Sequence, residues 1–176
     1  LNYLRICLNI ARAVRRLHAA GLAHSDLSYK NVLIAPTVNR ACVIDCDGLV
    51  VPGKYPPDVV GTPDFIAPEV VASAHLARDD PKRSLPSIRT DRHALAVLIY
   101  QYLLLRHPLR GAKVHAQDPR EDERLGMGER ALFVEHEQDP SNRIRAQDGK
   151  AIERPWLDTA SRPYTITGPY LAALFR

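Results

Sequence analysis

The sequence predicts a mainly α-helical fold that contains one short β-hairpin. Residues 1–20 repeat apolar side chains at helical spacing, and residues 91–109 are apolar on nearly every side, as a buried central helix would be. Between them, short apolar segments at 32–34 and 41–44 flank a turn, which predicts two paired strands. With 176 residues, 45% of them apolar, the chain is long enough to bury one core.

The first helix is predicted from an apolar stripe and a stop signal. Gly21 can adopt the left-handed conformation that follows a helix C-terminus. The side chains expected to face the core share one helical stripe: Leu1, Leu4, Leu8, Ala11, Val14 and Leu17.

Irregular and helical segments alternate after the predicted hairpin. Residues 48–63 are rich in glycine and proline, which predicts a loop, and Ala67-Pro68 favours a short helix beginning at Glu69. Thr90 or Asp91 is the expected N-cap of the central helix. Beyond Gly111 the chain becomes polar; we expect one short helix within 112–148 and the start of another at 168–176.

Composition and charge narrow the classes of function. The net charge of +4 comes from scattered residues without a basic block, so we expect no nucleic-acid partner. The longest apolar run, 94–105, is too short to span a bilayer, and we expect no membrane association. Cys7, Cys42 and Cys46 form no CxxC pair, which favours a reduced, cytoplasmic protein with buried thiols.

The polar stretch HSDLSYKN, residues 24–31, carries the first candidate site. A loop carboxylate such as Asp26 can accept the proton of an attacking hydroxyl, and the amide oxygen of Asn31 can bind a metal ion beside it. Lys30 adds a positive charge where phosphate charge would develop. The alternative is a solvated turn, because Asp and Asn are common turn residues.

The stretch VIDCDG, residues 43–48, carries the second candidate site. In an extended segment Asp45 and Asp47 would point to the same side, where a cation such as Mg²⁺ would relieve their mutual repulsion. The alternative is that one aspartate, Asp47 in particular, caps a turn ending at Gly48. A third stretch, GTPDFIAPE at 61–69, predicts a rigid turn, and its chemistry alone implies no function.

Taken in order, LHAAGLAHSDLSYKNVLI, VIDCDG, GTPDFIAPE and DRHALAVLIYQYLLLRHPL resemble the C-terminal lobe of a eukaryotic-like, bacterial Ser/Thr protein kinase. The resemblance implies ATP and Mg²⁺ as cofactors and a protein substrate. It makes Asp26 the catalytic aspartate, and Asn31 and Asp45 the Mg²⁺ ligands, with Asp47 as the alternative ligand. Lys30 would act beside them on the phosphates.

The same resemblance assigns supporting roles to four further residues. His24 resembles the buried structural histidine of the family, and Thr62 the threonine that bonds toward the catalytic loop. Glu69 resembles the glutamate that pairs with a buried arginine late in the lobe. Asp91 resembles the aspartate that ties the central helix to the backbone of the catalytic loop.

Three positions depart from the family pattern. Ser25 replaces the arginine before the catalytic aspartate, so we do not expect control by an activation-loop phosphate. Ser28 replaces the usual lysine, whose role Lys30 would take, as an arginine does in some tyrosine kinases. The usual Asp-Phe-Gly reads Asp-Cys-Asp-Gly at 45–48, and we favour Asp45 as the ligand because Val43 and Ile44 then complete the strand.

The resemblance also sets expectations for domains and partners. Residues 1–176 would form an incomplete C-lobe without the N-lobe and the final helices, and 112–167 would be a divergent, loop-rich insertion. The tail, with GERALFVEHEQDPSNR at 128–143, resembles a bacterial kinase-like group encoded with VWA-domain proteins and PP2C-type phosphatases in tellurite-resistance-like systems. The expected partners are therefore these proteins, a protein substrate, and the N-lobe or a protein that covers its surface.

Three functions compete on the sequence. A Ser/Thr protein kinase fits the full motif set, although this chain alone is expected to be inactive. A pseudokinase or docking module fits Ser25 and the altered Asp-Phe-Gly, but not the retained Asp26, Asn31 and Asp45. A small-molecule phosphotransferase would share the catalytic loop, but GTPDFIAPE resembles the protein-substrate platform of protein kinases.

Overall fold

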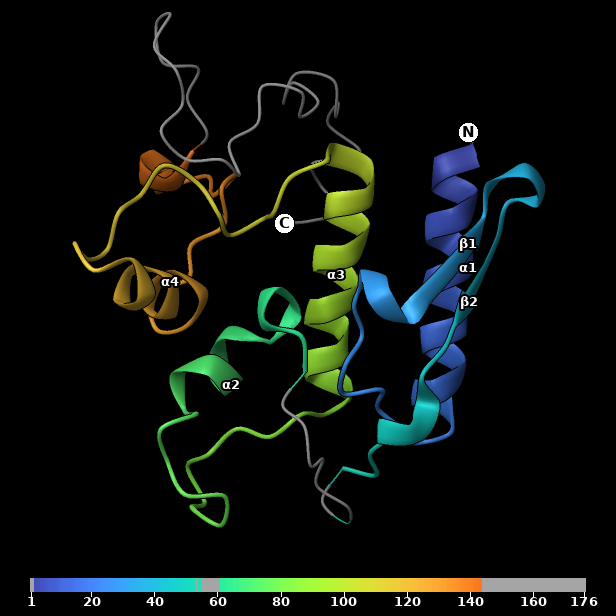
Figure 1. Ribbon diagram of the computed structural model, residues 1–176, viewed down its shortest axis with the longest axis horizontal. Helices are drawn as coiled ribbons and strands as arrows, with labels where there is room; N and C mark the ends of the chain where they lie inside the picture. The colour runs from blue at the N-terminus through green and yellow to red at the C-terminus, as the bar shows by residue number, and fades with distance from the viewer. Residues whose placement is uncertain (1, 53, 55–60, 144–176) are drawn as a thin grey trace, which may run out of the picture. The chain divides into compact units, whose positions relative to one another are not determined.

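The computed structural model describes residues 2–52, 54 and 61–143 (Figure 1). The chain divides into two compact units, Leu1–Ile99 and Tyr100–Arg176, each of which is described by itself. The prediction of a mainly α fold with one short hairpin is confirmed. The elements are α1 (Asn2–Ala19), β1 (Val32–Ala35), β2 (Arg40–Val43), α2 (Pro68–Ala72), α3 (Ile88–Leu104) and α4 (Pro119–Met127).

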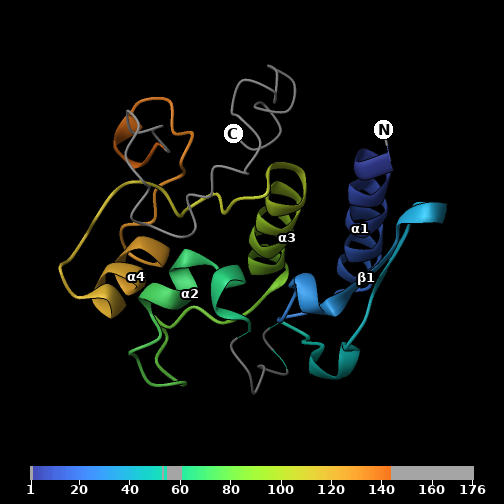
Figure 2. The same cartoon turned by 45° about the horizontal axis from the view of Figure 1, so that its top comes forward.

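Helix α1 ends as predicted but buries a different face. Gly21 is left-handed, with φ of 76°, and the N–H of Leu22 donates to the carbonyl of Leu17 across it, which closes the helix end. The predicted core residues Leu4 and Leu8 are 47% and 49% exposed. Of the predicted stripe Val14 is buried as expected, and Ile6, Cys7 and Ile10 complete the buried face. Helix α1 packs against β2 (Figures 1 and 2). This contact decides which face of the helix is buried, and the spacing of leucines alone does not predict it.

Strands β1 and β2 pair antiparallel, with Val32 opposite Val43 and Ala35 opposite Arg40. Both strands lie about one residue from their predicted bounds, because a 3₁₀ turn at Pro36–Val38 and a left-handed Asn39 make the connection. The second strand ends at Val43, before Ile44. The N–H of Ile44 donates instead to the carbonyl of Asn31, outside the strand pairing.

Helix α3 begins at Ile88, so the predicted N-cap at Thr90 or Asp91 is wrong. Ser87 and Thr90 cap the helix reciprocally: the N–H of Ser87 donates to Thr90 Oγ1 at 2.8 Å, and the N–H of Thr90 to Ser87 Oγ at 3.4 Å. Asp91 therefore lies inside the first turn, where its side chain is 2% exposed. Helix α2 likewise begins one residue earlier than predicted, with Pro68 at its first position.

The three cysteines are free, and only Cys7 is buried. Burial raises the pKa of Cys7 to about 11, so its thiol stays protonated at neutral pH. Cys42 and Cys46 are exposed, and the prediction of buried thiols is wrong for both, because they lie on the hairpin and on the turn that follows it. Within the described residues, every helix is too short or too polar to cross a membrane.

The unit that begins at Tyr100 is held by buried polar contacts. The hydroxyl of Tyr100 donates to Glu135 Oε1 at 2.7 Å, and Arg106 lies 3.9 Å from the same carboxylate, with both charged side chains almost fully buried. Asn142 Nδ2 donates to the carbonyls of Leu109 and Leu132. Within residues 112–143, α4 is the single α-helix, as predicted for the described part of 112–148; the helix predicted at 168–176 lies outside the described residues.

Candidate active site

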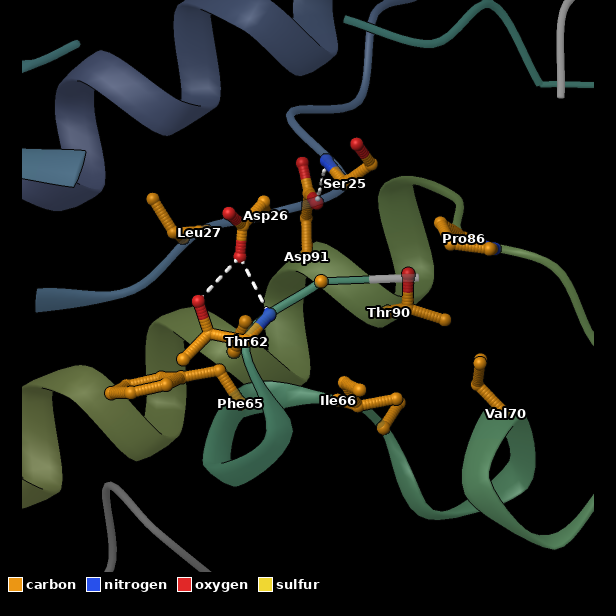
Figure 3. A pocket seen from close by; sticks show the side chains of 13 residues that line it. Ser25, Asp26, Leu27, Thr62, Phe65, Ile66, Val70, Pro86, Thr90 and Asp91 are labelled. Atoms are coloured by element: carbon orange, nitrogen blue, oxygen red, sulfur yellow. Dashed lines mark hydrogen bonds between the residues drawn. The ribbon is translucent and has the colours of Figure 1, made fainter. Parts of the chain in front are cut away.

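Two loops of the first unit meet at the carboxylate of Asp26. Asp26 Oδ1 accepts hydrogen bonds from the backbone N–H and the hydroxyl of Thr62, both at 2.7 Å (Figure 3). Gly61 allows this approach: its φ is 107°, and a Cβ there would lie 2.9 Å from the carbonyl oxygen of Ser25. Asp26 and Thr62 are 36 residues apart, and their contact joins two stretches. One is HSDLSYKN, residues 24–31, named the catalytic loop after the resemblance, and the other is GTPDFIAPE.

Asn31 holds the other oxygen of the same carboxylate. Its Nδ2 donates to the backbone carbonyl of Asp26 at 2.7 Å and to Asp26 Oδ2 at 3.1 Å. A 3₁₀ turn, Tyr29–Asn31, folds the chain back so that residues five apart can meet. Both bonds use the amide nitrogen of Asn31. Its Oδ1 makes no hydrogen bond within the described residues, so this oxygen can accept a cation.

Asp91 anchors the backbone of the catalytic loop from α3. Its Oδ2 accepts from the N–H of His24 at 2.6 Å, and its Oδ1 from the N–H of Ser25 at 3.0 Å (Figure 3). Ser25 has a φ of 67°, a left-handed conformation that costs roughly 1–3 kcal/mol and persists only where surrounding contacts impose it. A third contact, His18 Nε2 at 3.0 Å from Asp91 Oδ2, comes from α1. Sequence reasoning missed His18, because no local pattern marks it.

His24 connects the catalytic loop to the candidate metal loop. Its buried ring lies with Nε2 2.9 Å from the carbonyl oxygen of Ile44, which accepts a hydrogen bond when Nε2 carries the proton. Ile44 is also held by Asn31 through its own N–H, at 2.9 Å. The residue before Asp45 is therefore fixed to the catalytic loop at both of its backbone groups.

The premise that residues 43–48 are extended is wrong. The strand ends at Val43, Asp45 is left-handed with φ of 59°, and Cys46–Gly48 form a 3₁₀ turn, so side chains do not alternate here. Asp45 and Asp47 are both exposed. The hydroxyl of Ser25 donates to the carbonyl of Gly48 at 2.9 Å, which closes this turn onto the catalytic loop. The choice between the two aspartates as metal ligand stays a prediction.

The residues around Asp26 differ sharply in exposure. Ser28 is completely buried and its hydroxyl has no hydrogen-bond partner within the described residues, so it presents no polar group to a ligand. Lys30, on the same turn as Asn31, is exposed. Tyr29 is 61% exposed, and its ring lies 5.8 Å from the buried ring of Phe65.

Glu69 lies apart from the buried contacts. Its carboxylate is 3.8 Å from Arg89 Nε, and both side chains are largely exposed, so within the described residues this pair is not the buried one expected from the resemblance. Water screens such a pair, and it adds little stability.

The donor set suits a divalent cation that shares its ligands with phosphate. Within the residues that the structure describes, no three His, Cys, Asp or Glu side chains gather as a metal site. Asn31 Oδ1 and the exposed carboxylate of Asp45 are hard oxygen donors, and Mg²⁺ commonly takes only one or two protein ligands together with substrate phosphates. These residues therefore fit Mg²⁺ bound together with a nucleotide.

The sequence profile of the protein kinase domain matches residues 2–152. The chain therefore belongs to the protein kinase domain family, and the resemblance read from the motifs is confirmed. Its association with VWA-domain and PP2C proteins stays a prediction.

Several known proteins are similar to parts of the chain. The serine/threonine-protein kinase PknD of Chlamydia abortus is 28% identical over 141 residues, which is 65% of this chain and 14% of that protein. The death-associated protein kinase dapk-1 of Caenorhabditis elegans is 34% identical over 105 residues, 58% of this chain and 7% of that protein. The chain thus spans a small part of these relatives.

A solved structure shares the fold. The kinase PK-1 of Cydia pomonella granulovirus superposes with a TM-score of 0.50 at 21% identity, over 70% of this chain and 42% of that one. This similarity concerns the fold alone.

Proposed function

We propose that this chain forms the catalytic lobe of a protein serine/threonine kinase that uses ATP and Mg²⁺. The observation that carries the proposal is the double hold on Asp26: Thr62 bonds to one carboxylate oxygen and Asn31 to the other. These bonds come from two different loops and fix the carboxylate at the surface of the lobe. Positioning of this kind supplies much of the catalysis in phosphoryl transfer.

Each residue of the site has a distinct task in this proposal. Asp26 orients the substrate hydroxyl and accepts its proton as the hydroxyl oxygen attacks the γ-phosphorus of ATP, whose bond to the bridging oxygen breaks so that ADP leaves. Asn31 Oδ1 and Asp45, with Asp47 as the alternative, would hold Mg²⁺, which neutralises phosphate charge when bound. Lys30 adds a positive charge on the same turn. His24 and Asp91 position the loop through its backbone, without touching substrate.

The choice of a protein hydroxyl as substrate rests on Thr62 and its neighbours. Thr62 opens the GTPDFIAPE stretch and bonds directly to Asp26, so a polypeptide lying on this stretch would present its side chain to the carboxylate. The names of the PknD relatives describe Ser/Thr kinases, which agrees with this choice. A small-molecule phosphotransferase would have no use for such a platform.

Transfer from radiolabelled ATP by the natural full-length protein tests the proposal. Asp26→Asn should lower the rate by about 10²–10⁴-fold, the usual contribution of a positioned general base, with the fold intact. The matched control is Asp79→Asn, because Asp79 is exposed and lies outside the site. A rate within a few-fold of the parent for Asp26→Asn would remove this residue from the mechanism.

A docking module without catalysis is the second candidate. It is favoured by Ser25, which has no charge to meet an activation-loop phosphate, and by the altered Asp-Phe-Gly, which reads Asp-Cys-Asp-Gly at 45–48. This alternative predicts no transfer by the parent protein and the same partner binding by the parent and by Asp26→Asn. The two candidates therefore give opposite results in one experiment.

The 176-residue chain tested alone should transfer no phosphate and bind Mg-ATP weakly. Lys30, Asp45 and Asp47 are exposed, so water screens the attraction for a triphosphate of Lys30 and of a Mg²⁺ held by the aspartates. We propose that an N-lobe, or a protein covering its surface, closes the site. Calorimetry with Mg-ATP tests this. A micromolar dissociation constant, which corresponds to a binding free energy of about −8 kcal/mol, would show that this lobe binds the nucleotide without a second lobe.

The exposed cysteines and the resemblance of the tail bear on location and partners. The exposed free thiols of Cys42 and Cys46 suit the reducing cytoplasm, where we place the protein. VWA-domain and PP2C-type proteins remain proposed partners, and co-purification from the native source would test them.

A further inference from the structure

Tyr29 is an exposed aromatic residue of the catalytic loop, and the proposed phosphoryl transfer gives it no role. At 61% exposure it is the most exposed of the large apolar side chains within the described residues. Its hydroxyl makes no hydrogen bond within residues 2–52, 54 and 61–143, so polar bonding does not explain its position. A single exposed ring is common on protein surfaces. Tyr29 differs from such a ring because the fold holds it beside the candidate active site.

The ring of Tyr29 is held both through its backbone and through its side chain. The 3₁₀ turn Tyr29–Asn31 is closed by the N–H of Asn31, which donates to the carbonyl of Ser28 at 3.1 Å. The ring lies against buried Phe65, with the ring centroids 5.8 Å apart and the planes tilted by 57°. Tilted aromatic pairs at this separation attract each other, so the contact limits the freedom of the exposed ring.

Phe65 connects this ring to the carboxylate of Asp26. The N–H of Phe65 donates to the carbonyl of Thr62 at 2.9 Å, and Thr62 bonds to Asp26 (Figure 3). Asp26 and Tyr29 are three residues apart in the chain, so their Cα atoms are at most about 11 Å apart. An extended peptide covers that distance in about three residues. A peptide that presents a hydroxyl to Asp26 can therefore place one of its neighbouring side chains on Tyr29.

We propose that Tyr29 is a specificity-determining residue whose ring binds a large apolar side chain of the substrate, within about three residues of the phosphoacceptor serine or threonine. This inference rests on the proposed function. An apolar side chain gains burial against the ring. A carboxylate is disfavoured because the face of an aromatic ring carries negative partial charge. An arginine can stack on such a ring, but the exposed Lys30 that follows Tyr29 would repel it.

Peptides with one central serine test the proposal, with radiolabelled ATP and the natural full-length protein. Each of the three positions on either side of the serine is leucine, alanine or arginine in turn. At one position kcat/KM should be about fivefold or more higher for leucine than for alanine, and Tyr29→Ala should abolish most of this preference. Tyr29→Phe keeps the ring and should preserve it. The matched control is Tyr3→Ala, which removes another exposed tyrosine, on α1, and should leave the preference unchanged.

The preference for leucine separates substrate recognition from a structural role of Tyr29. If the ring only supports Phe65, Tyr29→Ala lowers the rates on the leucine and alanine peptides equally, and the proposal is wrong. It is also wrong if the parent shows no preference at any of these positions, or prefers arginine to leucine. In each of these cases the parent still transfers phosphate, and the proposed function stands. Absence of transfer by the parent to every peptide would contradict the proposed function, and this inference with it.

Discussion

The two units of the chain use carboxylates in opposite ways. In the first unit, Asp26 is held by Thr62 and Asn31 at a half-buried position on the surface, where a ligand can still reach it. In the second, Glu135 is 3% exposed and meets the hydroxyl of Tyr100 and the guanidinium of Arg106. Burial raises the pKa of Tyr100 further from neutrality, so its hydroxyl stays a donor.

The difference separates a positioned group from a structural one. A buried charge that loses its partner keeps its full desolvation cost, so a buried pair such as Glu135 with Arg106 matters for folding. Neutralising a carboxylate at the surface changes the free energy of unfolding little. The fixed geometry of Asp26 is therefore better explained by a role in the reaction than by a role in folding. Substitutions in the two units should therefore separate stability from activity.

The largest effect on stability is expected at Glu135. Glu135→Ala removes the carboxylate from buried Arg106 and Tyr100, and should lower the free energy of unfolding by about 3–5 kcal/mol. Asp26→Asn turns one accepting oxygen into a donor and should lower it by only about 1 kcal/mol. Glu129→Ala, an exposed control, should change it by no more than about 0.5 kcal/mol. Urea denaturation measures all three. If Asp26→Asn proves as destabilising as Glu135→Ala, the distinction between the units fails.

Metal dependence sharpens the assignment within the first unit. Asp45→Asn should raise the Mg²⁺ concentration needed for half-maximal transfer by roughly tenfold or more. Replacing even a residue that only supports a metal ligand typically lowers metal affinity by about that factor. Asp47→Asn should raise it less, because Asp47 lies farther along the turn from the fixed Ile44. The measurement is a Mg²⁺ titration of transfer in the full-length protein. Unchanged requirements in both variants would make these aspartates structural.

A smaller effect is expected from the contact between Ser25 and Gly48. Ser25→Ala removes the hydroxyl that donates to the Gly48 carbonyl and should lower kcat a few-fold with KM for ATP nearly unchanged, a cost of about 1 kcal/mol. Ser25→Gly also lacks the hydroxyl but adopts a positive φ without steric cost, so it should lose as much rate as Ser25→Ala. A rate near that of the parent in Ser25→Gly would show that the left-handed backbone, and not the hydroxyl, is what matters.

The smallest effect concerns His93, a largely buried group on α3. Burial lowers the pKa of His93 below its ordinary value of 6.5, against the opposing charge of Glu69. The unfolded chain therefore takes up a proton on His93 that the folded chain does not, and stability falls as the pH drops below about 6.5. His93→Gln should lose less stability than the parent between neutral pH and pH about 5. Urea denaturation at each pH measures the free energy of unfolding, and an equal fall with pH in the parent and in His93→Gln would contradict this.

Local contacts were the part of the site that the sequence could predict. Asp26 and Asn31 are five residues apart, and a single 3₁₀ turn brings them together. The C-terminus of α1 was equally predictable, because Gly21 can adopt a positive φ without steric cost. The extended reading of residues 43–48 failed because it assumed regular alternation where a left-handed Asp45 ends the strand.

Long-range contacts decided the rest. His18 lies 73 residues from Asp91 along the chain, and Ser25 lies 23 from Gly48, so no local periodicity could pair them. The same holds for the buried face of α1, where packing against β2 selects Ile6 and Ile10 over Leu4 and Leu8. Spacing along a helix shows which side chains share a face, but burial depends on what packs against that face.

The sequence by itself determined the family, the order of the elements and the residue types that carry the proposed chemistry, because these depend on local patterns and motifs. The resemblance already assigned Thr62 and Asp91 to the catalytic loop, but only the tertiary structure shows which atoms meet. Thr62 and Asn31 each bond to one carboxylate oxygen of Asp26, and Asp91 accepts from the backbone of the loop instead of capping its own helix. The physical reason is that a buried polar group must find partners wherever the fold supplies them. For Asp91 those partners are the N–H groups of a loop more than sixty residues away.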